Sequence, residues 1–110
     1  MEQFDNYQEL ARMTANNKGE VKDRLPNWAL GLAGEAGEVA DIIKKHTYHG
    51  HELDVEEIRD ELGDVLWYMA NLAYDLDLWF SEVPERNIEK LKARYPEGFS
   101  KERSINRDGK

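Results

Sequence analysis

The sequence contains no cysteine, carries more acidic than basic side chains and has no long apolar run. The absence of cysteine excludes disulfides, thiolate metal sites and a cysteine nucleophile. The formal charge of −8 argues against broad binding to nucleic acid or anionic membrane, because both need basic patches. No apolar run approaches the length that spans a bilayer, and residues 1–5 lack the basic and apolar regions of a signal peptide. A cytoplasmic protein is therefore expected.

The composition is that of a small, highly charged globular protein. The 110 residues, of which 40% are hydrophobic and 35% charged, give room for one domain with a single core. We expect that domain to span residues 1–110, with a polar tail from about residue 101. The sequence shows no alternating strand pattern, no internal repeat and no low-complexity tract.

Apolar residues recur at helical spacing in four segments. The expected helices run over about residues 5–15, 26–46 and 55–75, with a fourth after residue 81. Pro26 suits the first turn of the second helix, and Pro84 is tolerated in the first turn of the fourth, which Ser81 is expected to cap. Asp54, followed by Glu57, resembles the capping box that starts a helix. The pattern predicts an all-α bundle.

Two pairs of carboxylates fall on the apolar sides of the second and third helices. Glu35 and Glu38 project into the apolar arc of one helix, and Glu61 and Asp64 into that of the other. Gathering four carboxylates costs several kcal/mol per ion unless opposite charge is supplied. Oxygen ligands without histidine or cysteine favour Mg²⁺ or Mn²⁺, which share their shell with water and substrate phosphates. Spacing alone leaves open that the four acids lie at the edge of the apolar stripe and reach water.

The two acid pairs also carry a family resemblance. Gly31–Val39, GLAGEAGEV, and Glu61–Tyr68, ELGDVLWY, resemble the paired Glu-x-x-Glu and Glu-x-x-Asp motif of MazG-like pyrophosphohydrolases. One departure is Gly34, which stands where many members carry a second glutamate before the first motif acid. The resemblance covers nearly the whole chain, through the segments Tyr7–Gln8, Thr14–Ala15, Asn87–Leu91, Arg94–Pro96, Phe99–Ser100 and Arg107–Asp108.

The resemblance implies a fold, an activity and a set of ligands. The fold would be a bundle of four to five helices of the all-alpha NTP pyrophosphatase type, assembled as a dimer or a dimer of dimers. The activity would be hydrolysis of nucleoside triphosphates, deoxy or noncanonical ones included, to monophosphate and pyrophosphate. Glu35, Glu38, Glu61 and Asp64 would hold Mg²⁺, with Mn²⁺ as a substitute. Glu38 or Glu61 would accept the proton of the attacking water. Base and sugar preference stays open.

Six further residues are candidate contacts to the substrate: Asn27, Trp28, Tyr68, Asn87, Lys90 and Arg94. The Tyr68 hydroxyl could reach the sugar or a phosphate, and Asn87, Lys90 and Arg94 could bind phosphate oxygens. A base could stack on Trp28 and bond to Asn27. For Trp28, burial in a core or an interface is the preferred interpretation, and core packing explains Tyr68 about as well. A solvated helix face is the alternative for Asn87, Lys90 and Arg94.

Two other functions are weighed against the pyrophosphohydrolase. A ferritin-like di-iron bundle is disfavoured, because such bundles use Glu-x-x-His pairs and the third residue here is Glu38 or Asp64. The alternative of another class is a noncatalytic helical module that binds a nucleotide or a protein. Its apolar interaction surface would comprise Trp67, Leu78, Trp79 and Phe80. These residues could equally form the dimer interface of an enzyme.

Overall fold

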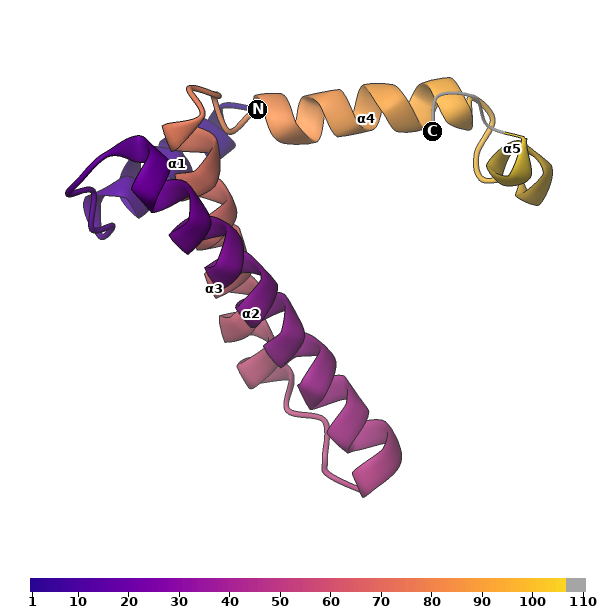
Figure 1. Ribbon diagram of the computed structural model, residues 1–110. Helices are drawn as coiled ribbons and strands as arrows, with labels where there is room; N and C mark the ends of the chain where they lie inside the picture. The colour runs from indigo at the N-terminus through magenta and orange to yellow at the C-terminus, as the bar shows by residue number, and fades with distance from the viewer. Residues whose placement is uncertain (107–110) are drawn as a thin grey trace.

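The computed structural model describes residues 1–106, and within that range the chain is entirely helical apart from its loops (Figure 1). The helices are α1 (Glu2–Met13), α2 (Val21–His49), α3 (Val55–Asp75), α4 (Glu82–Arg94) and α5 (Lys101–Ile105). This confirms the predicted all-α class. None of these helices is long and apolar enough to cross a membrane.

The expected boundary of α3 is confirmed, and those of α2 are wrong at both ends. The Asp54 carboxylate accepts a hydrogen bond of 3.1 Å from the Glu57 amide and so caps α3. Helix α2 begins at Val21, which leaves Pro26 inside the helix, and it continues to His49 instead of stopping near His46. It ends at Gly50, whose φ of 74° is a left-handed conformation that glycine adopts without steric cost.

The C-terminal part of the chain differs from the prediction in two details. The Ser81 side chain makes no capping hydrogen bond within residues 1–106, and its amide instead donates to the Asp5 carboxylate over 2.8 Å. The segment expected to be a polar tail forms α5, capped by the Ser100 hydroxyl, which accepts from the Arg103 amide. Arg107 and Asp108 lie outside the described residues.

Helices α2 and α3 form a long antiparallel hairpin, and α1 packs against α3 at the end remote from the connecting loop (Figure 1). A small buried core lies at this junction and consists of Ala11, Ala70, Ala73 and Phe80. The buried Gln8 side chain joins three segments there. Its amide nitrogen donates to the carbonyls of Ala70 and Leu78, and its oxygen accepts from the Phe80 amide. The turn after α3 is thereby fixed to α1.

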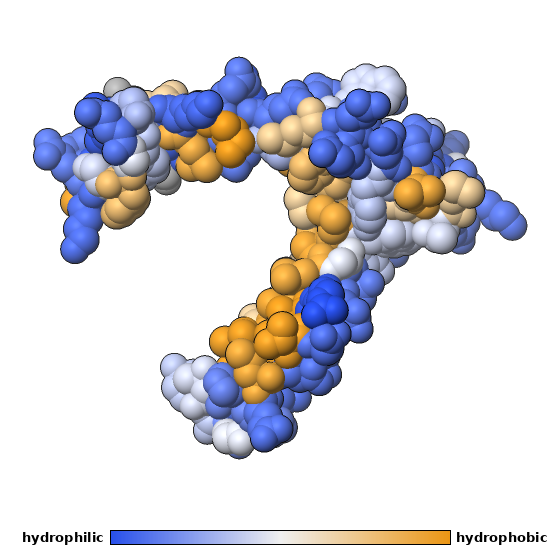
Figure 2. Space-filling model, turned by 180° about the vertical axis from the view of Figure 1, so that it is seen from behind, coloured by the Kyte–Doolittle hydropathy of each residue, from blue (hydrophilic) through white to orange (hydrophobic). Residues whose placement is uncertain are grey.

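Helix α4 leaves this junction as an arm that diverges from the hairpin (Figure 1). It has no buried residue, and the radius of gyration of the chain is 17.0 Å, against about 13 Å for a compact domain of this length. Apolar side chains run along the hairpin on the side that faces the arm, and more lie on the arm itself (Figure 2). Exposed apolar residues of these helices include Val55, Leu62, Ile88 and Leu91. The single chain therefore leaves an open apolar angle.

Candidate metal centre

Three of the four predicted metal ligands meet in the middle of the α2–α3 hairpin. One carboxylate oxygen from each of Glu35, Glu61 and Asp64 lies within 4.8 Å of the other two. Glu61 and Asp64 are three residues apart on α3 and so share one face, while α2 supplies Glu35 from across the hairpin. The two helices thus aim these acids at one another, as their position in the apolar arcs predicted.

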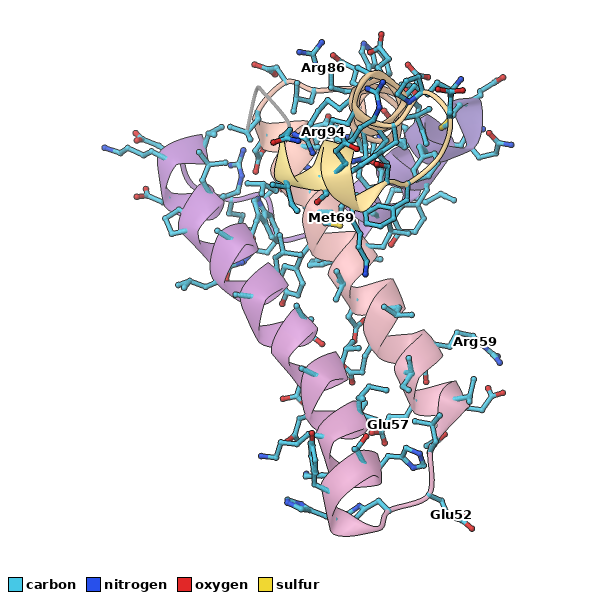
Figure 3. All side chains as sticks on the ribbon, turned by 90° about the vertical axis from the view of Figure 1, so that its right-hand side faces the viewer. Glu52, Glu57, Arg59, Met69, Arg86 and Arg94 are labelled. Carbon is cyan, nitrogen blue, oxygen red and sulfur yellow. The ribbon has the colours of Figure 1, made fainter. Side chains whose placement is uncertain are left out.

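The fourth predicted ligand, Glu38, is exposed and lies outside this group of three. It lines a neighbouring cavity of about 580 Å³ toward the hairpin loop, together with Asp41, Lys45, His51 and Glu57. Figure 3 shows Glu57 at this end of the hairpin, close to the loop that carries Glu52. Glu38 follows Glu35 by about one turn of α2 and so lies next to the cluster along the hairpin.

The cluster holds negative charge that the described residues do not balance. None of Glu35, Glu61 and Asp64 forms an ion pair within residues 1–106. The Oε2 atom of Glu61 is buried and has no hydrogen-bond partner among those residues. The adjacent Glu35 carboxylate, with which Glu61 can share a proton, raises the pKa of Glu61, and desolvation raises it further. A cation bound here would supply the missing charge and a partner for the orphaned oxygen.

Aromatic rings pack beside the cluster, one turn nearer to α1. The rings of Trp28, Trp67 and Tyr68 lie against one another, with centroids 5.6 Å apart for the two tryptophans and 5.0 Å for Trp67 and Tyr68. Trp28 is only 1% exposed, which agrees with the preferred interpretation of burial and leaves its indole no free face for a base. Tyr68 is half-buried, and the neighbouring candidate Asn27 is exposed.

The candidates on α4 are not brought to the carboxylates within one chain. Asn87, Lys90 and Arg94 lie on the arm, and beyond its start this arm packs against none of the other described helices. In Figure 3, Arg94 lies at the α4–α5 end of the molecule and Glu57 near the opposite end of the hairpin. Within residues 1–106 of one chain these three residues therefore lie away from the cluster.

A second buried acid, which sequence reasoning missed, lies at the last residue of α3. The Asp75 side chain is 2% exposed and accepts hydrogen bonds from Arg12 (2.8 Å), from two nitrogens of Arg24 (2.9 and 3.0 Å) and from the Trp28 indole (2.7 Å). The Arg24 hydrogen bond, together with those of Arg12 and Trp28, holds the pKa of Asp75 far below its usual range. This acid ties α1 and α2 to α3.

The chain is similar to a described family and to a phage protein. The model of the MazG nucleotide pyrophosphohydrolase domain matches residues 26–99, a range that contains the carboxylate cluster and the arm. The gene 37 protein of Mycobacterium phage L5 is 47% identical over 73 residues, which cover 63% of this chain and 64% of that protein. The chain thus spans less than two thirds of the length of this relative. No solved structure matches the chain.

Proposed function

Because the chain belongs to the family of MazG nucleotide pyrophosphohydrolase domains, we propose that it hydrolyses nucleoside triphosphates to a monophosphate and pyrophosphate. Proteins of this family generally depend on a divalent metal. The observation that carries the proposal is the cluster of Glu35, Glu61 and Asp64, in which one buried carboxylate oxygen has no partner within residues 1–106. Such a cluster is costly by itself and becomes favourable when a cation is bound.

The donor set fits a hard divalent cation. Three carboxylates within 4.8 Å of one another offer only oxygen, which suits Mg²⁺ or Mn²⁺ and leaves coordination positions for water and phosphate. A bound cation would supply positive charge to the phosphate oxygens and make a bound water more acidic. Glu38, one turn from Glu35, is the proposed fourth ligand after rotation of its side chain.

The remaining chemistry falls to side chains of the hairpin. Glu61 is the proposed acceptor of the proton of an attacking water, because its carboxylate lies in the cluster that would hold the cation. Glu38 is the alternative base. Tyr68 and Asn27 are proposed to contact the sugar or the base. The buried Trp28 instead packs its ring against that of Tyr68.

We further propose that the working form is a homodimer or homotetramer in which a second copy covers the open angle between hairpin and arm. The extended shape and the apolar inner side of that angle support this assembly (Figure 2). In such an assembly, Lys90 and Arg94 of the second copy could neutralise phosphate oxygens of a nucleotide at the hairpin. Light scattering that finds a stable folded monomer at low micromolar concentration would contradict this assembly.

The activity is tested with a panel of canonical, deoxy and modified nucleoside triphosphates. Each is incubated with the chain in Mg²⁺, in Mn²⁺ or in chelator, and monophosphate, diphosphate, pyrophosphate and orthophosphate are separated by chromatography. The expected result is monophosphate and intact pyrophosphate in the metal samples only. Stepwise release of orthophosphate would contradict the reaction type. No turnover across the whole panel would favour the noncatalytic interaction module.

A further inference from the structure

Helices α2 and α3 are in close contact where the Tyr68 ring lies on the backbone of Gly31. A Cβ atom built on Gly31 would lie 2.1 Å from Cε1 and 2.4 Å from Cζ of that ring. Both distances are far below van der Waals contact, so even alanine does not fit at this position unless the ring or a helix moves. The other three glycines of the two helices, Gly34, Gly37 and Gly63, have no described atom within 4 Å of such a Cβ.

The Tyr68 ring has little freedom to move away from Gly31. It packs edge-on against Trp67 and also against Trp28, with centroids 5.0 and 6.3 Å away. Trp28 is itself fixed by its indole hydrogen bond to Asp75 (2.7 Å), and the Trp67 indole donates to the Thr14 hydroxyl (2.8 Å). Because both neighbours are held, a side chain at position 31 would be accommodated by separation of the two helices.

This contact lies next to the carboxylate cluster in the register of the hairpin. Glu35 is one turn after Gly31 on α2, and Asp64 is one turn before Tyr68 on the antiparallel α3. The next pair of facing positions after Gly31 and Tyr68 is therefore Glu35 and Asp64, about 6 Å further along the helices. The spacing of the helices at the first pair sets the gap across which the acids of the second pair face each other.

We propose that Gly31 is a positioning residue which, through the Tyr68 ring, sets the separation of α2 and α3 and hence the affinity of the Glu35–Glu61–Asp64 cluster for a divalent cation. This inference rests on the proposed function for the nature of the ligand, a divalent cation. The helix separation that it invokes belongs to the metal-free chain and can be measured independently.

The test compares Gly31→Ala with Gly34→Ala, which adds the same methyl group to the same helix in open space. The affinity for Mn²⁺ alone, without nucleotide, is measured by electron paramagnetic resonance of the free ion. Gly31→Ala is expected to weaken binding at least tenfold, whereas Gly34→Ala keeps the wild-type affinity. In the Tyr68→Ala background, from which the ring is missing, adding Gly31→Ala should change the affinity less than twofold.

A metal-free measurement separates the inference from the proposed function. The chain has no cysteine, so Ala36→Cys with Asp60→Cys, at exposed positions of α2 and α3, provides two sites for spin labels. Gly31→Ala should lengthen the distance between the labels, and Gly34→Ala should not. An unchanged distance with unchanged Mn²⁺ affinity overturns the positioning role. A lengthened distance in a protein that binds no Mn²⁺ supports the role of Gly31 and refutes the proposed cation site.

Failure of Gly31→Ala to fold is also informative. If the double variant Gly31→Ala/Tyr68→Ala then folds as well as Tyr68→Ala alone, judged by circular dichroism, the clash with the ring is the cause and the inference stands. If the double variant fails to fold while Tyr68→Ala folds, Gly31 is needed for a reason other than the ring, and the inference is overturned.

Discussion

The same pair of helices holds two groups of acids whose negative charge is balanced in opposite ways. At the end of α3, Asp75 is buried and receives two arginines and an indole from its own chain. In the middle of the hairpin, Glu35, Glu61 and Asp64 face one another, and no arginine or lysine within residues 1–106 pairs with them. The charge of the first group is balanced within the folded chain, and the charge of the second group is not balanced by the described residues.

The pKa values follow this difference. Cationic hydrogen-bond donors lower the pKa of Asp75, and a neighbouring carboxylate together with burial raises the pKa of Glu61. An acid that its own chain neutralises stabilises the fold, whereas acids that repel one another cost stability until charge arrives from outside. The comparison therefore separates a structural ion cluster from a group of acids whose charge the described residues leave unbalanced.

The largest expected effect is the loss of Asp75. Asp75→Asn keeps the shape but leaves the nearly buried Arg12 and Arg24 without their counter-charge, and breaking a buried ion pair from one side costs about 3–5 kcal/mol. Urea denaturation in chelator should show that loss. Asp77→Asn, two residues further along at an exposed position with φ of 60°, is the matched control and should stay within about 0.5 kcal/mol. A loss below about 1 kcal/mol for Asp75→Asn would remove the contrast between the two groups.

The pH dependence of the metal-free protein should show both groups with opposite signs. Because the folded pKa of Glu61 is raised, the folded state takes up a proton first as the pH falls from 7, and stability should rise toward the ordinary glutamate value of about 4.3. The folded pKa of Asp75 is lowered, so its contribution is present above about 3.9 and is lost as the pH falls further.

Urea midpoints measured in chelator between pH 7 and pH 3 test this course. The matched comparison is Asp75→Asn. Its stability should still rise as the pH falls from 7, and it should lose less stability than wild type as the pH falls below about 3.9. A wild-type curve that falls steadily from pH 7 would show that repulsion within the carboxylate cluster does not limit stability.

The sequence predicted those parts of the molecule that depend on local pattern. Helix α3 begins and ends where its apolar period and the Asp54 cap indicated, because both signals lie within a few residues of the boundary. The predicted start of α2 is wrong because Pro26 suits a first turn. The five residues before Pro26 are also helical, and Arg24 among them is bound to Asp75, which lies 51 residues away in sequence.

Residue periodicity also predicted that Glu35, Glu61 and Asp64 point toward the partner helix, which the structure reproduces. It could not predict that Glu38 is exposed, because the helical period gives the face on which a side chain lies and not how far that side chain is covered. Residue periodicity could not predict the hydrogen bonds of Asp75 either, for a different reason. Arg12, Arg24 and Asp75 come from three helices, and no spacing in the sequence relates them.

The smallest expected change in stability, and the one that bears most directly on the carboxylate cluster, is that of Glu61→Gln. The substitution keeps size and removes one of the charges that repel one another, so the chelated variant should unfold at the same temperature as wild type or at a higher one. Removing the charge also removes a ligand, so the affinity for Mg²⁺ should fall at least tenfold, or about 1.4 kcal/mol of binding free energy.

Thermal midpoints of wild type and variant in chelator and in excess Mg²⁺ measure both effects together. Glu9→Gln, an exposed acid on α1, is the control and should keep both the wild-type midpoint and its rise with Mg²⁺. Equal or higher stability together with weaker Mg²⁺ binding is expected only for acids whose charge is balanced by a bound cation. Asp75→Asn, by contrast, should lose stability with or without the ion. If Glu61→Gln retains the full Mg²⁺-induced rise, Glu61 is not a ligand. The buried oxygen without a partner then belongs to an acid that binds no cation.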